Sequence, residues 1–193
     1  QRIYDSRYWK ETCFGLTVES VLEESARTFT KKNQAGPIAI GHLQFLALTL
    51  KLLQLHPDTD LMIETFIEQE DFKYTRALGA LYVRLTGRPA DIYHSLETLY
   101  RDGRKLRNFN VHNATDPWSF VHMDEFIHNL LTEPHVAGIT LPRLPLRRVL
   151  QEAGYLPEGS RQTALQDLLQ DFGGEPLAYL KHKALVEKSP AAL

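Results

Sequence analysis

The sequence has little of several residue types that would point to a particular chemistry. Cys13 is the single cysteine among 193 residues, which excludes an internal disulfide and a zinc site built from several cysteines. The formal net charge is −2, from 22 Lys and Arg against 24 Asp and Glu, so overall basicity would not hold this domain on nucleic acid. No apolar run reaches the roughly 18 residues of a transmembrane helix. Residue 1 is Gln rather than Met, so we expect a fragment of a longer protein.

Motifs of common enzymes are also missing. The sequence has no Gly-rich loop ending in Gly-Lys-Ser/Thr, no Gly-x-Gly-x-x-Gly after a strand and no Gly-x-Ser-x-Gly. Cys13 follows the aromatic pair Tyr8-Trp9 and has no activating base marked beside it. We interpret it as a buried structural thiol rather than a nucleophile. None of these motifs therefore marks an active site, and we expect no cofactor and no bound metal.

What the sequence does contain is a helical spacing of apolar residues. Between Asp71 and Gly87 the apolar side chains recur at intervals of three and four, which predicts one helix with Asp71 as its cap and Gly87 as its stop. Two more helices are predicted after Asp58 and from Pro89 onward. Shorter helices are predicted at residues 6–14, 18–28, 124–131, 146–153, 161–172 and 176–186.

The stretch from residue 41 to residue 55 differs from the others because leucines and a phenylalanine cover most of its helical circumference. A helix that is apolar nearly all round belongs in the middle of a bundle. It contains Lys51 and is too short to span a bilayer. We therefore predict that helix 41–55 is the central helix of the fold.

These patterns together predict an all-α fold. We expect a compact single-domain bundle of about ten helices with little or no sheet, since no convincing alternation of apolar and polar residues occurs. Residues 30–40 and 108–120 are expected to form long loops. We expect the helical domain to cover residues 1–172, and residues 173–193 to form a helical extension that is mobile or docked.

Two short motifs each have a functional and an ordinary explanation. Glu125 and His128 share a helix face and resemble half of a di-iron motif, with Asp91 and His94 as a partial mate. The other ligands are not identifiable, so we favour ordinary surface residues at a helix start. Residues 142–145 match the Pro-x-x-Pro pattern of groove ligands. We favour the start of a helix there, because such ligands normally lie in disordered segments.

A basic group lies at the expected end of the helix that begins at Pro89. Three of its members are three and four residues apart and could share a helix face. With the aromatic residue and amides that follow, they could contact RNA phosphates and stack a base. The ordinary explanation is a solvated helix end, which the near-neutral net charge favours. The candidate RNA-binding residues are Arg101, Arg104, Lys105, Arg107 and Phe109.

Several short sequence blocks occur along the chain in an order that is typical of one protein family. The blocks are Tyr8-Trp9-Lys10-Glu11, Cys13-Phe14-Gly15-Leu16-Thr17, Leu48-Thr49-Leu50-Lys51, Leu53-Gln54, Glu70-Asp71-Phe72-Lys73-Tyr74, Leu78-Gly79-Ala80-Leu81-Tyr82, Arg84-Leu85-Thr86-Gly87, Asp124-Glu125-Phe126-Ile127 and Leu141-Pro142-Arg143-Leu144. Over about residues 1–172 the chain resembles the amino-terminal domain of the pre-mRNA-splicing factor 38 family. The stretch from Glu70 to Gly87 is the most specific part of this resemblance.

The resemblance implies an all-helical domain without enzymatic activity. Members of that family act in the nucleus as components of the spliceosome around the tri-snRNP, and are needed when the precatalytic complex is activated. The domain is implied to be a protein-binding hub. Its implied partners are a helical segment of a microfibrillar-associated-type splicing protein and a small zinc-finger splicing protein. We expect no membrane partner, a monomer when the chain is alone, and at most weak contact with RNA.

The candidate protein-binding residues lie at two charged positions near the blocks of the resemblance. In recognition of this kind, apolar anchors enter a groove while charges at its rim set the orientation. The alternative is that each is an ordinary surface or capping residue. The candidates are Glu68, Glu70, Asp71, Phe72 and Lys73 at one helix junction, and Arg143, Arg147 and Arg148 at the other.

Overall fold

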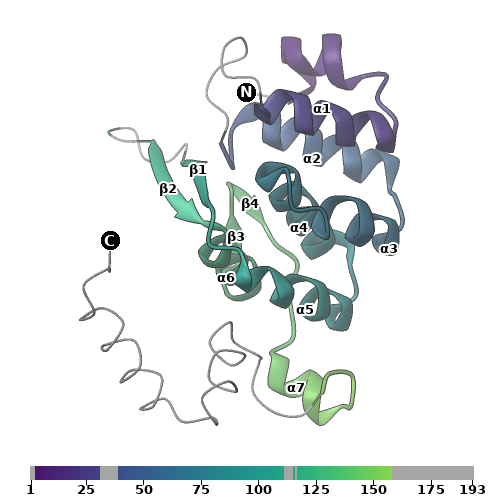
Figure 1. Ribbon diagram of the computed structural model, residues 1–193, viewed down its shortest axis with the longest axis vertical. Coiled ribbons are helices and arrows are strands. Elements are labelled where there is room, and N and C mark those ends of the chain that lie inside the picture. Colours follow the sequence, from purple (N-terminus) through teal and green to yellow (C-terminus); the bar gives the residue numbers. More distant parts are fainter. Residues whose placement is uncertain (1–2, 31–38, 111–114, 116, 158–193) are drawn as a thin grey trace, which may run out of the picture. The chain divides into compact units, whose positions relative to one another are not determined.

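The fold is mostly helical, as predicted. The computed structural model describes residues 3–30, 39–110, 115 and 117–157 (Figure 1). No helix among them is long and apolar enough to cross a membrane. The α-helices within this part are α1 (Val18–Thr30), α2 (Leu43–Leu55), α3 (Thr59–Met62), α4 (Lys73–Thr86), α5 (Pro89–Glu97), α6 (Met123–Thr132) and α7 (Arg147–Glu152). The 3₁₀ segments are η1 (Ile3–Asp5) and η4 (Thr98–Arg101), and the π-helical segments are η2 (Trp9–Cys13) and η3 (Ile63–Ile67).

Two short antiparallel hairpins accompany the helices. Strands β1 (Lys105–Phe109) and β2 (Trp118–His122) form a two-stranded ribbon, and β3 (His135–Val136) pairs with β4 (Ile139–Thr140) (Figure 1). The prediction of little sheet is confirmed, but the placement of Arg104, Lys105 and Arg107 at a helix end is wrong, because the last helical segment before them, η4, ends at Arg101. Helix α5 ends before this region, and Leu106 is buried opposite Val121. The alternation of apolar and polar residues in β1 is too short to have been recognised in the sequence.

The ribbon is joined to the helices by a short backbone ladder. Ile40 donates its N–H to the carbonyl of Arg107 and accepts the N–H of Phe109, both at 2.8 Å. Between Ile40 and α2, Gly41 has φ +78°, and a Cβ atom there would lie 2.5 Å from the carbonyl oxygen of Phe109. Glycine is therefore required where the ribbon approaches the start of α2.

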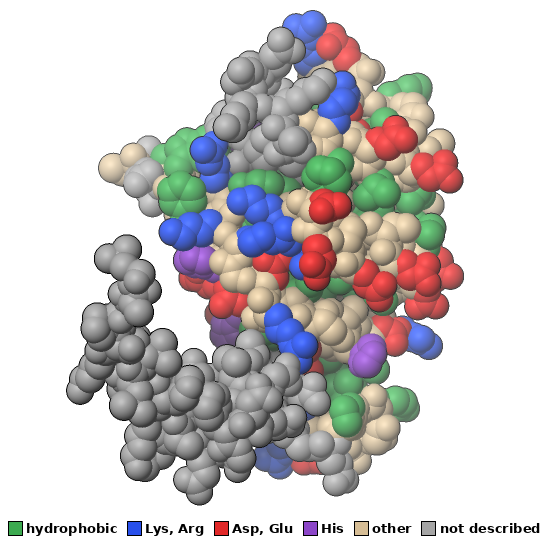
Figure 2. Space-filling model, viewed as in Figure 1, with side chains coloured by type: hydrophobic (Ala, Val, Ile, Leu, Met, Phe, Trp, Pro, Cys, Tyr) green, Lys and Arg blue, Asp and Glu red, His purple; other side chains and the backbone are tan. Residues whose placement is uncertain are grey.

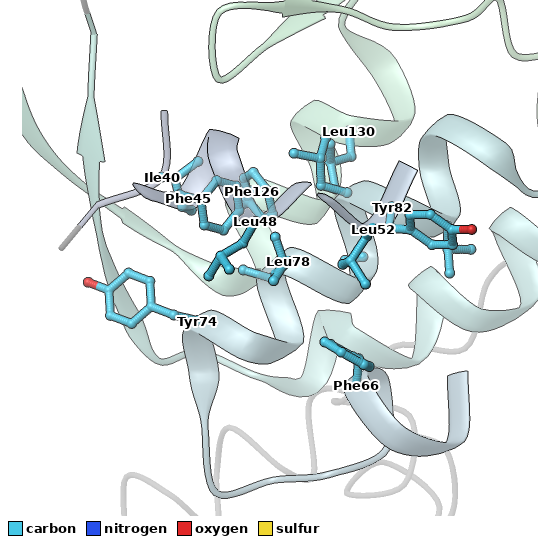
Figure 3. Close-up of a cluster of buried hydrophobic side chains, with 14 of the residues drawn as sticks. Ile40, Phe45, Leu48, Leu52, Phe66, Tyr74, Leu78, Tyr82, Phe126 and Leu130 are labelled. Carbon is cyan, nitrogen blue, oxygen red and sulfur yellow. The ribbon is translucent and has the colours of Figure 1, made fainter. Parts of the chain in front are cut away.

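Helix α4, rather than α2, is the most enclosed element. Every residue of α4 from position 74 to position 84 is buried, whereas Leu50, Leu53 and Leu55 on α2 are only partly buried. Helix α4 contacts α1, α2, α3, η3, α5 and α6. Figure 3 shows side chains of α2, η3, α4 and α6 meeting in one cluster around Leu78. The prediction that helix 41–55 is the centre is corrected accordingly: α2 forms one wall of a core that surrounds α4.

Two buried arginines explain why α4 does not look like a central helix in the sequence. Arg84 donates to the carbonyls of Leu130 and Pro142, at 2.7 Å each, and burial lowers its pKa from the ordinary value. Arg76 pairs with Asp102. Because each guanidinium finds acceptors inside the protein, its burial is tolerated.

Most predicted helices lie within a few residues of the observed ones. One predicted cap is wrong: α4 is preceded by Phe72, not Asp71, at its N-cap, and the side chain of Gln69 accepts the N–H of Phe72 at 2.9 Å. Predicted helices 161–172 and 176–186, and the expected boundary between residues 172 and 173, lie outside the described residues. They remain predictions.

Candidate interaction surfaces

The junction between η3 and α4 carries the first group of candidate residues. Glu68, Glu70, Asp71 and Phe72 are exposed, and the Phe72 side chain retains 39% of its accessible surface. Lys73 is half-buried and its Nζ donates to the carbonyl of Lys105 at 2.5 Å. Lys73 therefore links the junction to β1, while the exposed candidates before it remain accessible to a partner.

A cleft of about 640 Å³ opens beside this junction. It brings together residues that are distant in the sequence, because η3 and the acidic junction form one side and the end of α5 with the residues after it forms the other. Members of both candidate groups, Glu68 and Glu70 together with Arg101 and Arg104, contribute to its lining. The remaining lining residues are Ile63, Ile67, Arg76, His94, Ser95, Thr98, Leu99 and Asp102.

Asp102 holds the wall of this cleft together. Its carboxylate accepts the Nη1 of Arg76 at 2.9 Å and the Nη2 of Arg104 at 2.6 Å. The side chains of Asp102 and Arg76 are only 6% and 9% exposed. Arg104 also donates to the carbonyl of Glu70. The sequence analysis missed Asp102 and Arg76, although an acidic residue inside a run of cations was a visible signal of pairing.

The electrostatics of Asp102 follow from this geometry. Burial alone would raise the pKa of the carboxyl group, because it disfavours the charged form. Hydrogen bonds from the side chain and backbone of Arg104, and from Arg76, favour the carboxylate and lower the pKa to about 2. Asp102 is therefore ionised at neutral pH and neutralises charge within the cluster.

The rest of the candidate RNA-binding group lies on the ribbon and does not line this cleft. Lys105, Arg107 and Phe109 alternate along β1, and they stand opposite His122, Phe120 and Trp118 respectively on β2. Residues directly opposite in an antiparallel pair share a face, so these six side chains occupy one side of the ribbon. Figure 2 shows Lys and Arg side chains gathered between β1 and α4, whereas acidic side chains gather over α3. The structure thus divides the basic group between Arg104, which lines the cleft, and Lys105, which begins β1.

A second hollow, of about 730 Å³, lies between the ribbon and the β3–β4 hairpin. Apolar side chains, among them Ile40, Leu46, Phe109, Phe126 and Val136, contribute much of its lining. Asn129, Glu133 and His135 add polar groups. None of the residues that the sequence analysis chose for protein binding lies there.

The second group of protein-binding candidates lies on and before α7. Arg147 pairs with Glu97 of α5 at 2.8 Å, and both side chains are mostly buried. Arg148 pairs with Glu152 on the surface of the same helix at 2.8 Å, and Arg143 is exposed. Leu146 and Val149 are exposed hydrophobic residues beside them. This surface therefore combines cations with apolar groups, but Arg147 already holds α7 against α5.

The Glu125–His128 motif lies near the start of α6, as favoured, whereas the Pro142–Pro145 segment lies before the N-cap of α7, Leu146, rather than within the helix. The Glu125 carboxylate accepts the N–H of His122 and completes a capping box at the start of α6. The described residues contain no group of three or more His, Cys, Asp and Glu side chains that could hold a metal ion. The proline segment packs onto the domain, since Arg84 and Tyr93 donate to the carbonyls of Pro142 and Pro145.

The fold defines a class of protein: a helical domain with two short β-hairpins and open clefts on its surface. Comparison with known proteins gives the family. The chain matches the PRP38 family over residues 1–154. It is 46% identical over 173 residues to pre-mRNA-splicing factor 38A of Xenopus laevis and 45% identical to that of Homo sapiens, covering 88% of this chain and 52% of each relative. The chain belongs to the PRP38 family and spans about half the length of these relatives.

A solved structure supports the same assignment. A chain from the crystal structure of the Snu23–Prp38–MFAP1(217–258) complex of Chaetomium thermophilum superposes with a TM-score of 0.71 and 30% sequence identity. The match covers 96% of this chain and 89% of that chain. The expected resemblance to the splicing factor 38 family is therefore confirmed, and with it the helical fold.

Proposed function

We propose that the chain is a non-enzymatic protein-interaction scaffold of the nuclear spliceosome. It acts with the tri-snRNP in the precatalytic complex and is needed for activation during pre-mRNA splicing. The observation that carries this proposal is the similarity to a chain solved in a complex named for Snu23, Prp38 and MFAP1, together with the 45–46% identity to splicing factor 38A. A scaffold needs stable surfaces rather than a reactive centre, and the enclosed α4 core provides the support for them.

The partners follow from the same similarity. We propose two partners, a helical segment of a microfibrillar-associated-type protein and a small zinc-finger protein, to correspond to the MFAP1 segment and the Snu23 chain of that complex. An amphipathic segment that docks in a groove is held by a few apolar anchors, while charges at the rim set its orientation and its association rate.

The cleft beside the η3–α4 junction is the surface we propose for the helical segment. Its rim carries exposed Glu68 and Glu70 on one side and Arg101 on the other. Ile63 and Ile67 supply apolar floor, and the half-exposed Phe72 stands beside the cleft. A segment with a basic edge and one or two aliphatic anchors fits this arrangement.

The α7 surface is the proposed second contact. Arg143 and Arg148 offer positive charge next to exposed Leu146 and Val149. An acidic segment with an apolar residue would match it. Because Arg147 pairs with Glu97 inside the domain, Arg148 rather than Arg147 is the residue whose reversal tests binding without disturbing α7.

Calorimetric titration of the purified chain with an MFAP1-type segment tests the proposal. We expect saturable binding that Phe72→Ala together with Glu70→Lys weakens by about tenfold or more. Phe14→Ala is the matched control, since its ring is 78% exposed on another part of the domain. Absence of binding by the unmodified chain would contradict the scaffold proposal. If neither the double substitution at the junction nor Arg148→Glu weakens binding, the scaffold proposal stands, but neither the cleft nor the α7 surface is the binding site.

A further inference from the structure

One face of the β1–β2 ribbon combines cations and aromatic rings without any acidic side chain. Lys105 and Arg107 are exposed on β1, and Phe120 on β2 is 70% exposed directly opposite Arg107. Strands Lys105–Phe109 and Trp118–His122 contain no Asp or Glu. Residues two apart on a strand are about 7 Å apart, so the two cations and the ring form a compact cluster.

These cations differ from most others in the described part of the chain. Arg7, Arg27, Arg88 and Arg148 each pair with a carboxylate three or four residues away in the sequence. The side chains of Lys105 and Arg107 have no hydrogen bond or ion pair with another described residue. Two neighbouring cations without a counter-charge in the described part of the chain raise the local positive potential there, and that potential favours an anionic ligand.

The aromatic end of the ribbon is fixed in place by packing. The rings of Phe109 and Trp118 lie 4.7 Å apart between centroids, and His42 contacts both, at 5.5 Å and 6.0 Å. Burial lowers the pKa of His42, so this imidazole is neutral at physiological pH. The ribbon therefore presents Phe120 and part of Trp118 on a supported platform rather than on loose side chains.

We propose that this face of the ribbon binds single-stranded RNA. Lys105 and Arg107 would contact consecutive phosphates, and Phe120, with the exposed edge of Trp118, would stack unpaired bases. This combination of a cationic track and aromatic platforms is the physical requirement for binding single strands without sequence preference. An acidic protein segment would also use the two cations, but exposed flat rings interleaved with them match unpaired bases better, because every base can stack on an aromatic face. The proposal does not rest on the proposed scaffold function, because it uses a different surface.

Fluorescence anisotropy with a labelled single-stranded RNA of about 12 nucleotides tests the proposal. At about 50 mM salt we expect binding that weakens as salt rises to about 200 mM. Phe120→Ala should weaken binding by about fivefold or more through lost stacking. The double change Lys105→Ala and Arg107→Ala should weaken it by about tenfold, and should make the slope of log K against log salt shallower by about 1.4.

Two matched variants act as controls. Phe14→Ala removes an equally exposed ring elsewhere, and Arg7→Ala with Arg88→Ala removes two exposed cations that already have carboxylate partners. Both should bind RNA like the unmodified chain, and a duplex of the same length should bind more weakly because its bases are already stacked. No binding up to about 100 μM, equal losses in the controls, or equal affinity for the duplex would each overturn the proposal. A further contradicting result would be that the ribbon substitutions weaken binding of the MFAP1-type segment while the unmodified chain shows no RNA binding.

Discussion

Arg104 and Arg107 lie three residues apart in one basic run, yet their surroundings are opposite. Arg104 is held by the carboxylate of Asp102 and donates to the carbonyl of Glu70. Arg107 is exposed on the ribbon and its side chain has no partner among the described residues. Charge density in a sequence therefore does not measure charge available for binding. Asp102 converts the first part of the run into a structural cluster, and β1 carries the second part to the surface.

Among the substitutions that test the difference between Arg104 and Arg107, removal of the Asp102 side chain should have the largest effect on stability. Asp102→Ala leaves the buried guanidinium of Arg76 without its carboxylate, and we expect a loss of about 3 kcal/mol in unfolding free energy. Urea denaturation followed by circular dichroism measures it. Asp91→Ala is the control, because its partner Arg88 is 86% exposed and the loss should stay below about 1 kcal/mol. Equal losses would mean that the Arg76–Asp102 pair is not a structural element.

The pH dependence of stability sharpens the same point. The pKa of Asp102 is lowered from 3.8 to about 2: burial opposes ionisation, but hydrogen bonds from Arg104 and Arg76 outweigh it. A lowered pKa stabilises the folded state above the unfolded-state pKa, and that stability is lost as the pH falls from about 4 toward about 2. We expect a contribution on the order of 2 kcal/mol. Urea titrations between about pH 5 and about pH 2.5 should show a smaller loss in Asp102→Asn than in the unmodified chain.

A substitution at Gly41 should disturb the contact that holds the ribbon next to the start of α2. Gly41→Ala would put a Cβ atom 2.5 Å from the carbonyl oxygen of Phe109, and we expect a loss of about 2 kcal/mol. Gly138→Ala is the matched control, since Gly138 has φ +75° but no neighbouring atom within 4 Å. It should lose only the backbone strain, about 1 kcal/mol. Hydrogen exchange at the amide of Phe109, which donates to Ile40, should accelerate in the first variant only.

The smallest effect should come from the exposed cations themselves. Arg107→Ala should change the unfolding free energy by less than about 0.5 kcal/mol, whereas Arg104→Ala should cost about 1.5 kcal/mol through its lost charged hydrogen bonds. Thermal and urea denaturation of both variants measure the difference. If Arg107→Ala destabilises the protein as much as Arg104→Ala does, the conclusion that Arg104 stabilises the fold and Arg107 does not would be wrong.

Much of the helical architecture could be predicted because apolar spacing survives in the sequence. Helices α1, α4, α5 and α6 were expected close to where they lie. The central role of α4 could not be predicted, because Arg76 and Arg84 make it look less buried than α2. Their acceptors lie on other elements, at Asp102, Leu130 and Pro142. Contacts so distant in the chain leave no local periodicity.

For the candidate surfaces, the sequence indicated which charged residues take part but not how the fold brings them together. The sequence marked both the acidic junction and the basic run, but not that Glu70 and Arg104 line one cleft. The strand register that sets Arg107 and Phe120 face to face could not be read from the sequence, because it depends on pairing across the intervening loop. Whether the junction, α7 and ribbon residues bind partners remains a prediction that the experiments above test.

The environment of Cys13 makes these experiments simpler to perform. Its thiol is buried, and burial, together with the charge of nearby Glu24, raises its pKa to about 12 even though Lys51 opposes the shift. Thiol reagents react with the thiolate. We therefore expect the native cysteine to be unreactive toward maleimide dyes in the folded protein. A cysteine introduced at an exposed position such as Ser119, which leaves the ring of Phe120 in place, would then carry a fluorophore or spin label on the ribbon alone, with no need to remove the native thiol first.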